Sequence, residues 1–162
     1  MKILLTIILL STSSCIDLGG RQNKAQIIES MANTLLKQYP DTPTKKVKEV
    51  AKTDLLVDVR DAKERLVSTL PGAISKEDFI AKFDVLRTRT IVAYDTIGQR
   101  SVPWVKELKQ KGLLAYNLHG GILAWAQNGG SFVDITGQET KRVHVYAEAW
   151  EMLPEGFEAI TQ

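Results

Sequence analysis

Cysteine is almost absent from this 162-residue chain: the only one, Cys15, lies close to the N-terminus. A single cysteine excludes an intramolecular disulfide and a cysteine-based metal cluster. No residue after position 15 can supply a thiolate, so the folded part must do without thiol chemistry. The residue types and their spacing indicate neither a metal site nor a cofactor.

An excess of charge of one sign is lacking as well. The chain has 21 Lys and Arg against 19 Asp and Glu, a net charge of +2. This charge is too small and too dispersed to indicate a nucleic-acid-binding surface. The densest basic segment, residues 45–49, is interpreted as the solvated face of a short helix. With 44% hydrophobic residues, the chain is expected to form one globular domain with a core of its own.

A hydrophobic run long enough to span a bilayer is missing too. The apolar run at residues 3–10 follows Lys2 and leads through serines and a threonine to Cys15, as in an export signal. A lone cysteine after small residues resembles the bacterial lipoprotein signal, in which the cysteine is lipidated. We therefore predict a signal over residues 1–15, lipidation of Cys15 and a folded part outside the cytoplasm, attached to the membrane by its lipid. A secreted protein cleaved nearby is the alternative.

The chain after the leader alternates between apolar runs and helical patterns. We expect a tether and an N-terminal helix within residues 16–43, with the tether extending to residue 24 and the helix over 25–38. Apolar runs predict strands at residues 54–60, 91–94 and 114–118, with helical patterns between them at 61–66, 76–83 and 101–111.

This alternation is typical of an α/β domain with a parallel sheet flanked by helices. The predicted domain covers residues 44–130, and we expect residues 131–162 to form an extension that packs on it.

The segment between the strand at 91–94 and the helix from Ser101 is the candidate site. Backbone N–H groups that turn inward in such a loop, together with a helix N-terminus, bind anions. The candidate anion-binding residues are Asp95, Thr96, Ile97, Gly98, Gln99, Arg100 and Ser101.

Four ordered segments, at residues 57–60, 70–74, 94–101 and 120–125, together resemble the rhodanese-like domain family. The resemblance implies a five-stranded parallel sheet between helices, with the loop at the rim as the site. It also implies that Thr69 stands where the family usually has a histidine. The residues that match the family's structural motifs are Asp58, Arg60, Pro71, Gly72, Gly120, Gly121 and Trp125.

Active members of that family begin the loop with a cysteine, which takes sulfane sulfur from a donor such as thiosulfate and holds it as a persulfide. The length of the loop at residues 95–100 is similar to that of sulfurtransferases rather than related phosphatases. Asp95 occupies the cysteine position in this chain, and a carboxylate oxygen cannot form a persulfide. We expect no catalytic residue, and hypothesise that Asp95 accepts hydrogen bonds from the N–H groups of its own loop.

The predicted function is that of a catalytically degenerate rhodanese-like domain, which binds or scaffolds an envelope protein or a small anion at the bacterial cell envelope. One alternative is an enzyme that uses Asp95 and Arg100 on an anionic substrate. Another is a structural domain whose N-terminal helix or tail carries the partner surface. Arg100 is expected either to meet an anionic ligand or to brace Asp58 or another carboxylate.

The remaining histidines and tryptophans are expected to have no part in catalysis. His119 is predicted to be an exposed side chain at the rim of the site, and His144 is not expected to bind a metal. The tryptophans are interpreted as packing residues: Trp104, Trp125 and Trp150.

Overall fold

The computed structural model describes residues 19–161, with side chains from Lys24 onward. The predicted signal and Cys15 lie outside the described residues. Among the helices that the structure describes, none is long and apolar enough to cross a membrane.

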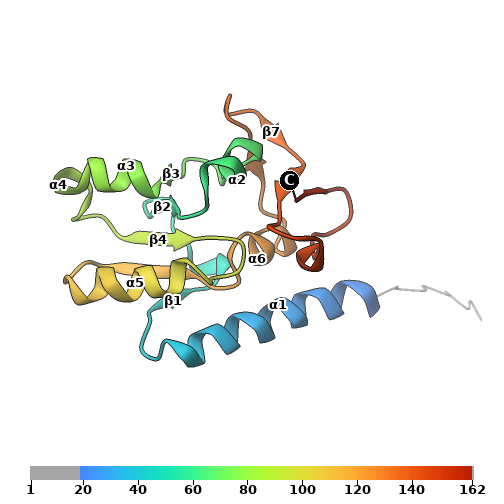
Figure 1. The fold of residues 1–162 in the computed structure, drawn as a ribbon, viewed down its shortest axis with the longest axis horizontal. Coiled ribbons are helices and arrows are strands. Elements are labelled where there is room, and N and C mark those ends of the chain that lie inside the picture. Colours follow the sequence, from blue (N-terminus) through green and yellow to red (C-terminus); the bar gives the residue numbers. More distant parts are fainter. Residues whose placement is uncertain (1–18, 162) are drawn as a thin grey trace, which may run out of the picture.

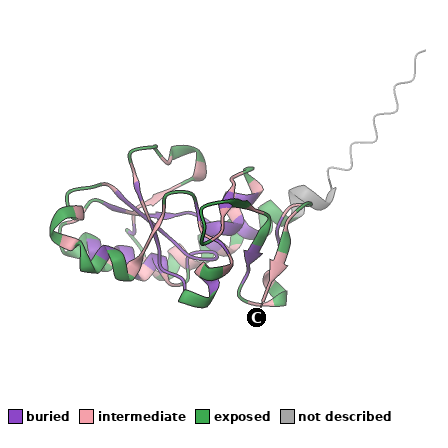
Figure 2. Cartoon of the chain, turned by 90° about the horizontal axis from the view of Figure 1, so that it is seen from above, coloured by how far each residue is buried: buried purple, intermediate pink, exposed green. Residues whose placement is uncertain are grey.

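Within residues 19–161, five parallel strands form the central sheet in the order β1-β5-β4-β2-β3, which confirms the predicted α/β class (Figure 1). β4 lies in the middle, and all four of its residues are buried, as Figure 2 shows for the inner strands in general. The strands are β1 (Thr44–Lys45), β2 (Leu55–Asp58), β3 (Ile74–Ser75), β4 (Ile91–Tyr94) and β5 (Ala115–Leu118).

Strand β1 was not foreseen, because residues 45–49 were expected to belong to a helix. Only the 3-10 helix η1 (Val47–Glu49) forms there. β1 has two residues at the sheet edge, too few to show the alternation by which a strand is recognised. Lys45 is not purely solvated either, since its Nζ lies 2.7 Å from the carboxylate of Asp54.

The helices largely follow the predicted patterns, with two differences. α1 begins at Gly19, so residues 19–24 are helical rather than a tether. The predicted helix over 76–83 is divided into two. Its spacing predicts a buried stripe of Phe79, Ile80 and Phe83, but Ile80 is 57% exposed. The helices are α1 (Gly19–Gln38), α2 (Ala62–Val67), α3 (Lys76–Ala81), α4 (Phe83–Leu86), α5 (Ser101–Gln110) and α6 (Gly121–Gln127).

Apolar side chains on the two faces of the sheet form two separate clusters. On one face, Ile91 and Ala93 of β4 pack with Phe79 of α3 and Val105 of α5. On the other face, Val92 and Tyr94 pack with α6, with Ile28 of α1 and with the C-terminal tail. In Figure 1 the long α1 helix lies along the lower side of the molecule, beneath α5 and α6.

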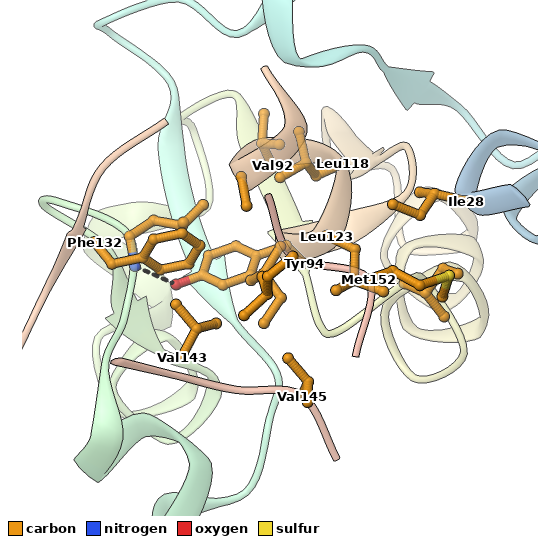
Figure 3. Packing of buried hydrophobic residues seen from close by; sticks show 14 residues of the cluster. Ile28, Val92, Tyr94, Leu118, Leu123, Phe132, Val143, Val145 and Met152 are labelled. Carbon is orange, nitrogen blue, oxygen red and sulfur yellow. Dashed lines mark hydrogen bonds between the residues drawn. The ribbon is translucent and has the colours of Figure 1, made fainter. Parts of the chain in front are cut away.

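The C-terminal tail contributes directly to this second cluster. It contains β6 (Phe132–Val133) and β7 (Glu139–Thr140), which pair antiparallel, then β8 (Arg142–His144), the 3-10 helix η2 (Glu148–Trp150) and β9 (Glu158–Ile160). Figure 3 shows the Tyr94 ring surrounded by apolar residues that include Phe132, Val143 and Val145 of the tail. The buried tail residues make the extension part of the folded unit.

Candidate functional site

The Asp95 carboxylate lies at the centre of its own loop. Oδ1 accepts hydrogen bonds from the backbone N–H groups of Ile97, at 2.7 Å, and Gly98. Oδ2 accepts from Arg100 N–H and from Ser101 N–H, at 3.0 Å. The residue is 1% exposed, so this is the self-capped arrangement that the sequence suggested.

The local backbone explains why an anion is stable at this position. The four N–H groups and the N-terminus of α5 direct positive dipole ends at the carboxylate, which offsets the cost of burying its charge. Gly98 supplies the sharp bend of the loop with φ +127°, a conformation that side chains disfavour. Ser101 fixes the end of the loop through a buried hydrogen bond from its Oγ to Asn117 Oδ1, at 2.6 Å.

Gly121, at the start of α6, supports the loop from behind. The next two N–H groups of the helix, those of Ile122 and Leu123, donate to the carbonyl oxygens of Asp95 and Thr96, at 2.9 and 3.3 Å. The backbone of α6 and that of the loop are therefore held together by direct hydrogen bonds. Backbone atoms of Asp95 and Thr96 occupy the place where a Cβ on Gly121 would lie, which gives a structural reason for glycine at this position.

Arg100 forms a bidentate ion pair with Glu64 of α2. Its Nη1 and Nη2 donate to the two carboxylate oxygens of Glu64, at 2.5 and 2.9 Å. Asp61 and Asp95 lie farther from the guanidinium, at 3.7 and 3.9 Å. Of the two predicted roles for Arg100, the structure thus provides the brace, with Glu64 rather than Asp58 as its partner.

The reason is that Asp58 already pairs with Arg60. The Arg60 guanidinium donates from Nε and Nη2 to Asp58, at 2.7 to 3.2 Å, and from Nη2 to the Ser68 carbonyl. Thr69 donates from Oγ1 to Asp58 at 3.0 Å. Its Oγ1 also lies 2.7 Å from the hydroxyl of Tyr94, so this buried network connects β2, β4 and the turn at residues 70–72.

The other residues of the family motifs shape turns or pack against the core. Gly72 has φ +74° in the turn after Pro71, and Gly120 has φ +74° just before α6. Trp125 donates from Nε1 to the Ser131 carbonyl at 2.9 Å and packs against the core.

Glu64 provides a pH-dependent contribution to stability. Burial raises the pKa of its carboxyl, but hydrogen bonds from Arg100 and the Asp61 N–H, together with nearby positive charge, lower the pKa overall below its ordinary value of 4.5. The ionised form is therefore favoured by folding. Its stabilising effect is complete above about pH 4.5 and is lost as the pH falls toward the lower pKa of the folded state.

Replacing Glu64 with glutamine is expected to lower the free energy of unfolding by about 2 kcal/mol at neutral pH, because Arg100 loses its charged partner. The difference between wild type and variant should shrink below about pH 4.5. Urea denaturation at several pH values measures it. Glu77→Gln is the control, since Glu77 pairs with Arg65 at 2.9 Å while its own side chain is 69% exposed. A difference that is independent of pH would contradict the prediction.

A small pocket opens beside the loop. It has a volume of about 190 Å³ and lies between the loop and the tail; its lining residues are Asp95, Thr96, Ile97, Gln99, Arg100, Tyr146 and Trp150. A neighbouring groove of about 340 Å³ shares Ile97, Gln99 and Trp150 with it and extends to Met31 and Leu35 of α1. Trp150, expected only to pack, thus also lines the pocket, while Trp104 packs in the core against Phe79.

Both histidines are buried, and the expectation that His119 is exposed was wrong. His119 is 5% exposed, with Nε2 3.1 Å from a carboxylate oxygen of Glu29 on α1. His144 is 1% exposed, with Nδ1 3.9 Å from a carboxylate oxygen of Glu64. Among the described residues there is no group of three or more His, Cys, Asp or Glu side chains that could hold a metal ion.

Glu64 is the site residue that sequence reasoning missed. The sequence analysis named only Asp58 as a carboxylate partner of Arg100, whereas the fold brings Glu64 and Asp61 to the loop. A signal was available, because β2 and β4 are parallel neighbours and the residues after them meet at one edge of the sheet. Asp61 and Glu64 follow β2 in capping-box spacing, which places Glu64 in the first turn of α2.

Comparisons with known proteins agree with this architecture. The family model described as rhodanese-like domain matches residues 42–128. The chain is similar to the solved structure of a rhodanese-related protein from Thermoplasma volcanium, with a TM-score of 0.51, 24% identity and coverage of 56% of this chain and 97% of that one. It is also similar to a thiosulfate sulfurtransferase from Pseudomonas aeruginosa, with a TM-score of 0.54, 18% identity and coverage of 68% of this chain but 23% of that one. No curated protein matches the chain. At these identities the two structures bear on the fold alone.

Proposed function

The chain belongs to the rhodanese-like domain family of the sulfurtransferase superfamily, and we propose that it is a member without sulfurtransferase activity that binds or scaffolds a partner protein at the bacterial cell envelope. One observation carries this proposal. The residue at the head of the loop is an aspartate whose carboxylate already accepts the hydrogen bonds of four loop N–H groups.

The chemistry of sulfur transfer supports the loss of activity. A thiolate must attack the sulfane sulfur of the donor and hold it as a persulfide, and Asp95 offers oxygen in its place. A carboxylate at the centre of the loop also repels an anionic donor and occupies the N–H groups that would bind it. These contacts favour a partner other than a small anion.

The same contacts weigh against an altered enzyme that uses Asp95 and Arg100. Both oxygens of Asp95 are engaged by N–H groups, and the guanidinium of Arg100 is engaged by Glu64. Neither group is free to attack or to bind a substrate anion without breaking these bonds. The groove toward Met31 and Leu35 is instead suited to the apolar side chains of a protein partner.

A gain-of-function variant tests the proposal directly. The wild-type protein is expected to produce no thiocyanate from thiosulfate and cyanide above background. Asp95→Cys should produce thiocyanate, because its thiolate takes the place of the carboxylate in the ring of N–H groups. In that variant the thiolate attacks the sulfane sulfur, sulfite leaves, and cyanide removes the bound sulfur. Mass spectrometry should show one added sulfur atom after exposure to thiosulfate alone.

Asp95→Ser is the control for this test, because a hydroxyl fits the same loop but forms no persulfide. Turnover by wild-type protein, abolished in the Asp95→Ser variant, would overturn the proposal. An inactive but folded Asp95→Cys variant would contradict the part of it that regards the loop as an intact family site. A phosphatase panel on wild type and Asp95→Ser tests the altered enzyme, and loop-dependent turnover there would favour it.

The envelope location is proposed from the leader alone. Metabolic labelling of a producing bacterium with a palmitate analogue is expected to label the wild-type protein and to leave Cys15→Ser unlabelled, since the chain has no other cysteine. Fractionation should then place wild type with membranes and the variant in the soluble exported fraction. Equal labelling of both proteins would contradict lipidation at Cys15.

A further inference from the structure

One segment of the tail covers the loop pocket. This segment, residues 142–150, is termed the strap. It begins with β8, whose His144 is buried, and continues to Tyr146 and Trp150, which line the pocket opposite Arg100. What fixes Tyr146 and Trp150 therefore decides how open the pocket is.

Tyr146 is held in an unfavourable backbone conformation. Its φ is +73°, in the left-handed region that a tyrosine rarely adopts. The side chain is 57% exposed and contacts the Trp150 ring, at 6.3 Å between centroids, and the Arg100 guanidinium, at 5.8 Å from the ring centre. Exposed aromatic contacts of this kind are weak, so another interaction is needed to keep this conformation.

Two hydrogen bonds do so. The N–H of Ala147 donates to the Val145 carbonyl oxygen across the turn, at 2.9 Å, and His144 accepts the second bond. The backbone N–H of Tyr146 donates to Nδ1 of His144 at 3.1 Å. Nδ1 can accept only when it carries no proton, so the imidazole is neutral with its proton on Nε2. Nε2 is buried and has no hydrogen-bond partner among the described residues. The neutral ring therefore links the buried β8 to the exposed turn at Tyr146.

The charges that face His144 are of both signs. Glu64 on α2 lies 3.9 Å from Nδ1 and favours the protonated ring. Burial, together with the positive charges of Arg60, Lys63 and Arg100, opposes protonation and lowers the pKa of His144 below its usual range. The ring is thus neutral at neutral pH and becomes charged on acidification.

We propose that His144 is a proton-sensitive latch for the loop pocket. When a proton binds Nδ1, the N–H of Tyr146 loses its acceptor and faces another N–H donor. The strained turn then relaxes, and Tyr146 and Trp150 move away from the loop. The charged imidazole also competes with Arg100 for Glu64. At neutral pH the strap therefore keeps the pocket narrow, and in acid the pocket widens, whatever ligand it takes.

NMR spectroscopy of the full-length protein tests this latch. The pH is lowered from about 7.5 to about 4.5 while the His144 ring, the Tyr146 amide and the Trp150 indole are followed. The Tyr146 amide and the Trp150 indole should shift with the same midpoint as the His144 ring. Hydrogen-exchange protection of the Tyr146 amide should fall about tenfold, as for the loss of one hydrogen bond. The amides of Val92 and Tyr94 in β4 should keep their protection, which separates local opening from unfolding.

The two histidines of the chain provide a matched pair of variants. His144→Gln keeps an acceptor that does not titrate in this range, so the shifts of Tyr146 and Trp150 should disappear. His119→Gln removes the other buried histidine and should retain them. The latch is overturned if the Tyr146 amide moves with a midpoint different from that of the His144 ring, or if the transition persists in His144→Gln. The first criterion uses wild type alone, so it holds even if a variant does not fold.

Discussion

Asp95→Ala is expected to lower the free energy of unfolding by about 4 kcal/mol, because four backbone N–H groups lose a charged acceptor at once. Asp95 is only 1% exposed, so water does not fully replace these bonds. Asp95→Asn should cost less, since its carbonyl oxygen still accepts two of the four bonds. Urea denaturation followed by circular dichroism measures both changes.

Asp134 provides the matched control for Asp95. It also accepts backbone N–H groups of its own turn, those of Thr136 and Gln138, but in an exposed hairpin. Asp134→Ala should therefore cause a far smaller loss, because water satisfies the freed groups. Equal stabilities of Asp95→Ala and wild type would show that the carboxylate does not hold the loop. Stabilisation of the loop would then no longer explain an aspartate at this position.

Gly121→Ala is expected to destabilise the protein by about 4 kcal/mol, through a different mechanism. A Cβ at this position would lie 2.3 Å from the carbonyl oxygen of Asp95 and 2.7 Å from the carbonyl group of Thr96. Both obstacles are backbone atoms, so no side-chain rotation relieves the clash. Separation of α6 from the loop would break the hydrogen bonds from Ile122 and Leu123 and expose core residues of the helix.

Gly112→Ala is the control that measures the cost of a positive φ without a steric clash. Gly121 and Gly112 both have a positive φ, +54° and +79°. At Gly112, however, no atom lies within 4 Å of the Cβ that alanine would add. Its substitution should cost only about 1 kcal/mol, the strain of a left-handed alanine. Thermal and urea denaturation of the two variants should differ by several-fold in the free energy lost. Equal losses would mean that the approach of α6 to the loop is looser than the contacts imply.

Much of the fold followed from local patterns in the sequence. The apolar runs of β2, β4 and β5 and the helical spacing of α5 are visible within short windows, because each element buries residues at a fixed period. The cap of α3 is equally local: Ser75 and Asp78 have the spacing of a helix cap, and Ser75 Oγ accepts the N–H of Asp78 at 3.0 Å. The strand-like stretch at residues 142–146 likewise indicated β8. β1, β6, β7 and β9 were harder to foresee, since two or three residues show no period.

The contacts of the candidate site are likewise partly local in sequence and partly long-range. The self-capping of Asp95 involves partners within six residues of it along the chain, so the aspartate, the loop and the following helix together indicated it. The ion pair of Arg100 with Glu64 joins residues 36 positions apart, and the sequence alone offered several carboxylates as partners. Only the neighbouring positions of β2 and β4 in the sheet, and the commitment of Asp58 to Arg60, determine which one is used.

By itself, then, the sequence determined the family, the loop and the position of Asp95 at its head, because these depend on residue types at short range. The tertiary structure decided that both histidines are buried, that Glu64 braces Arg100, and that Tyr146 and Trp150 cover the pocket. The positions of His144, Tyr146 and Trp150 depend on a tail that returns to the sheet and buries Val143 and Val145 against β4 and α6. No local period specifies where such a segment packs, since its position is set by the apolar surface that the rest of the fold leaves uncovered.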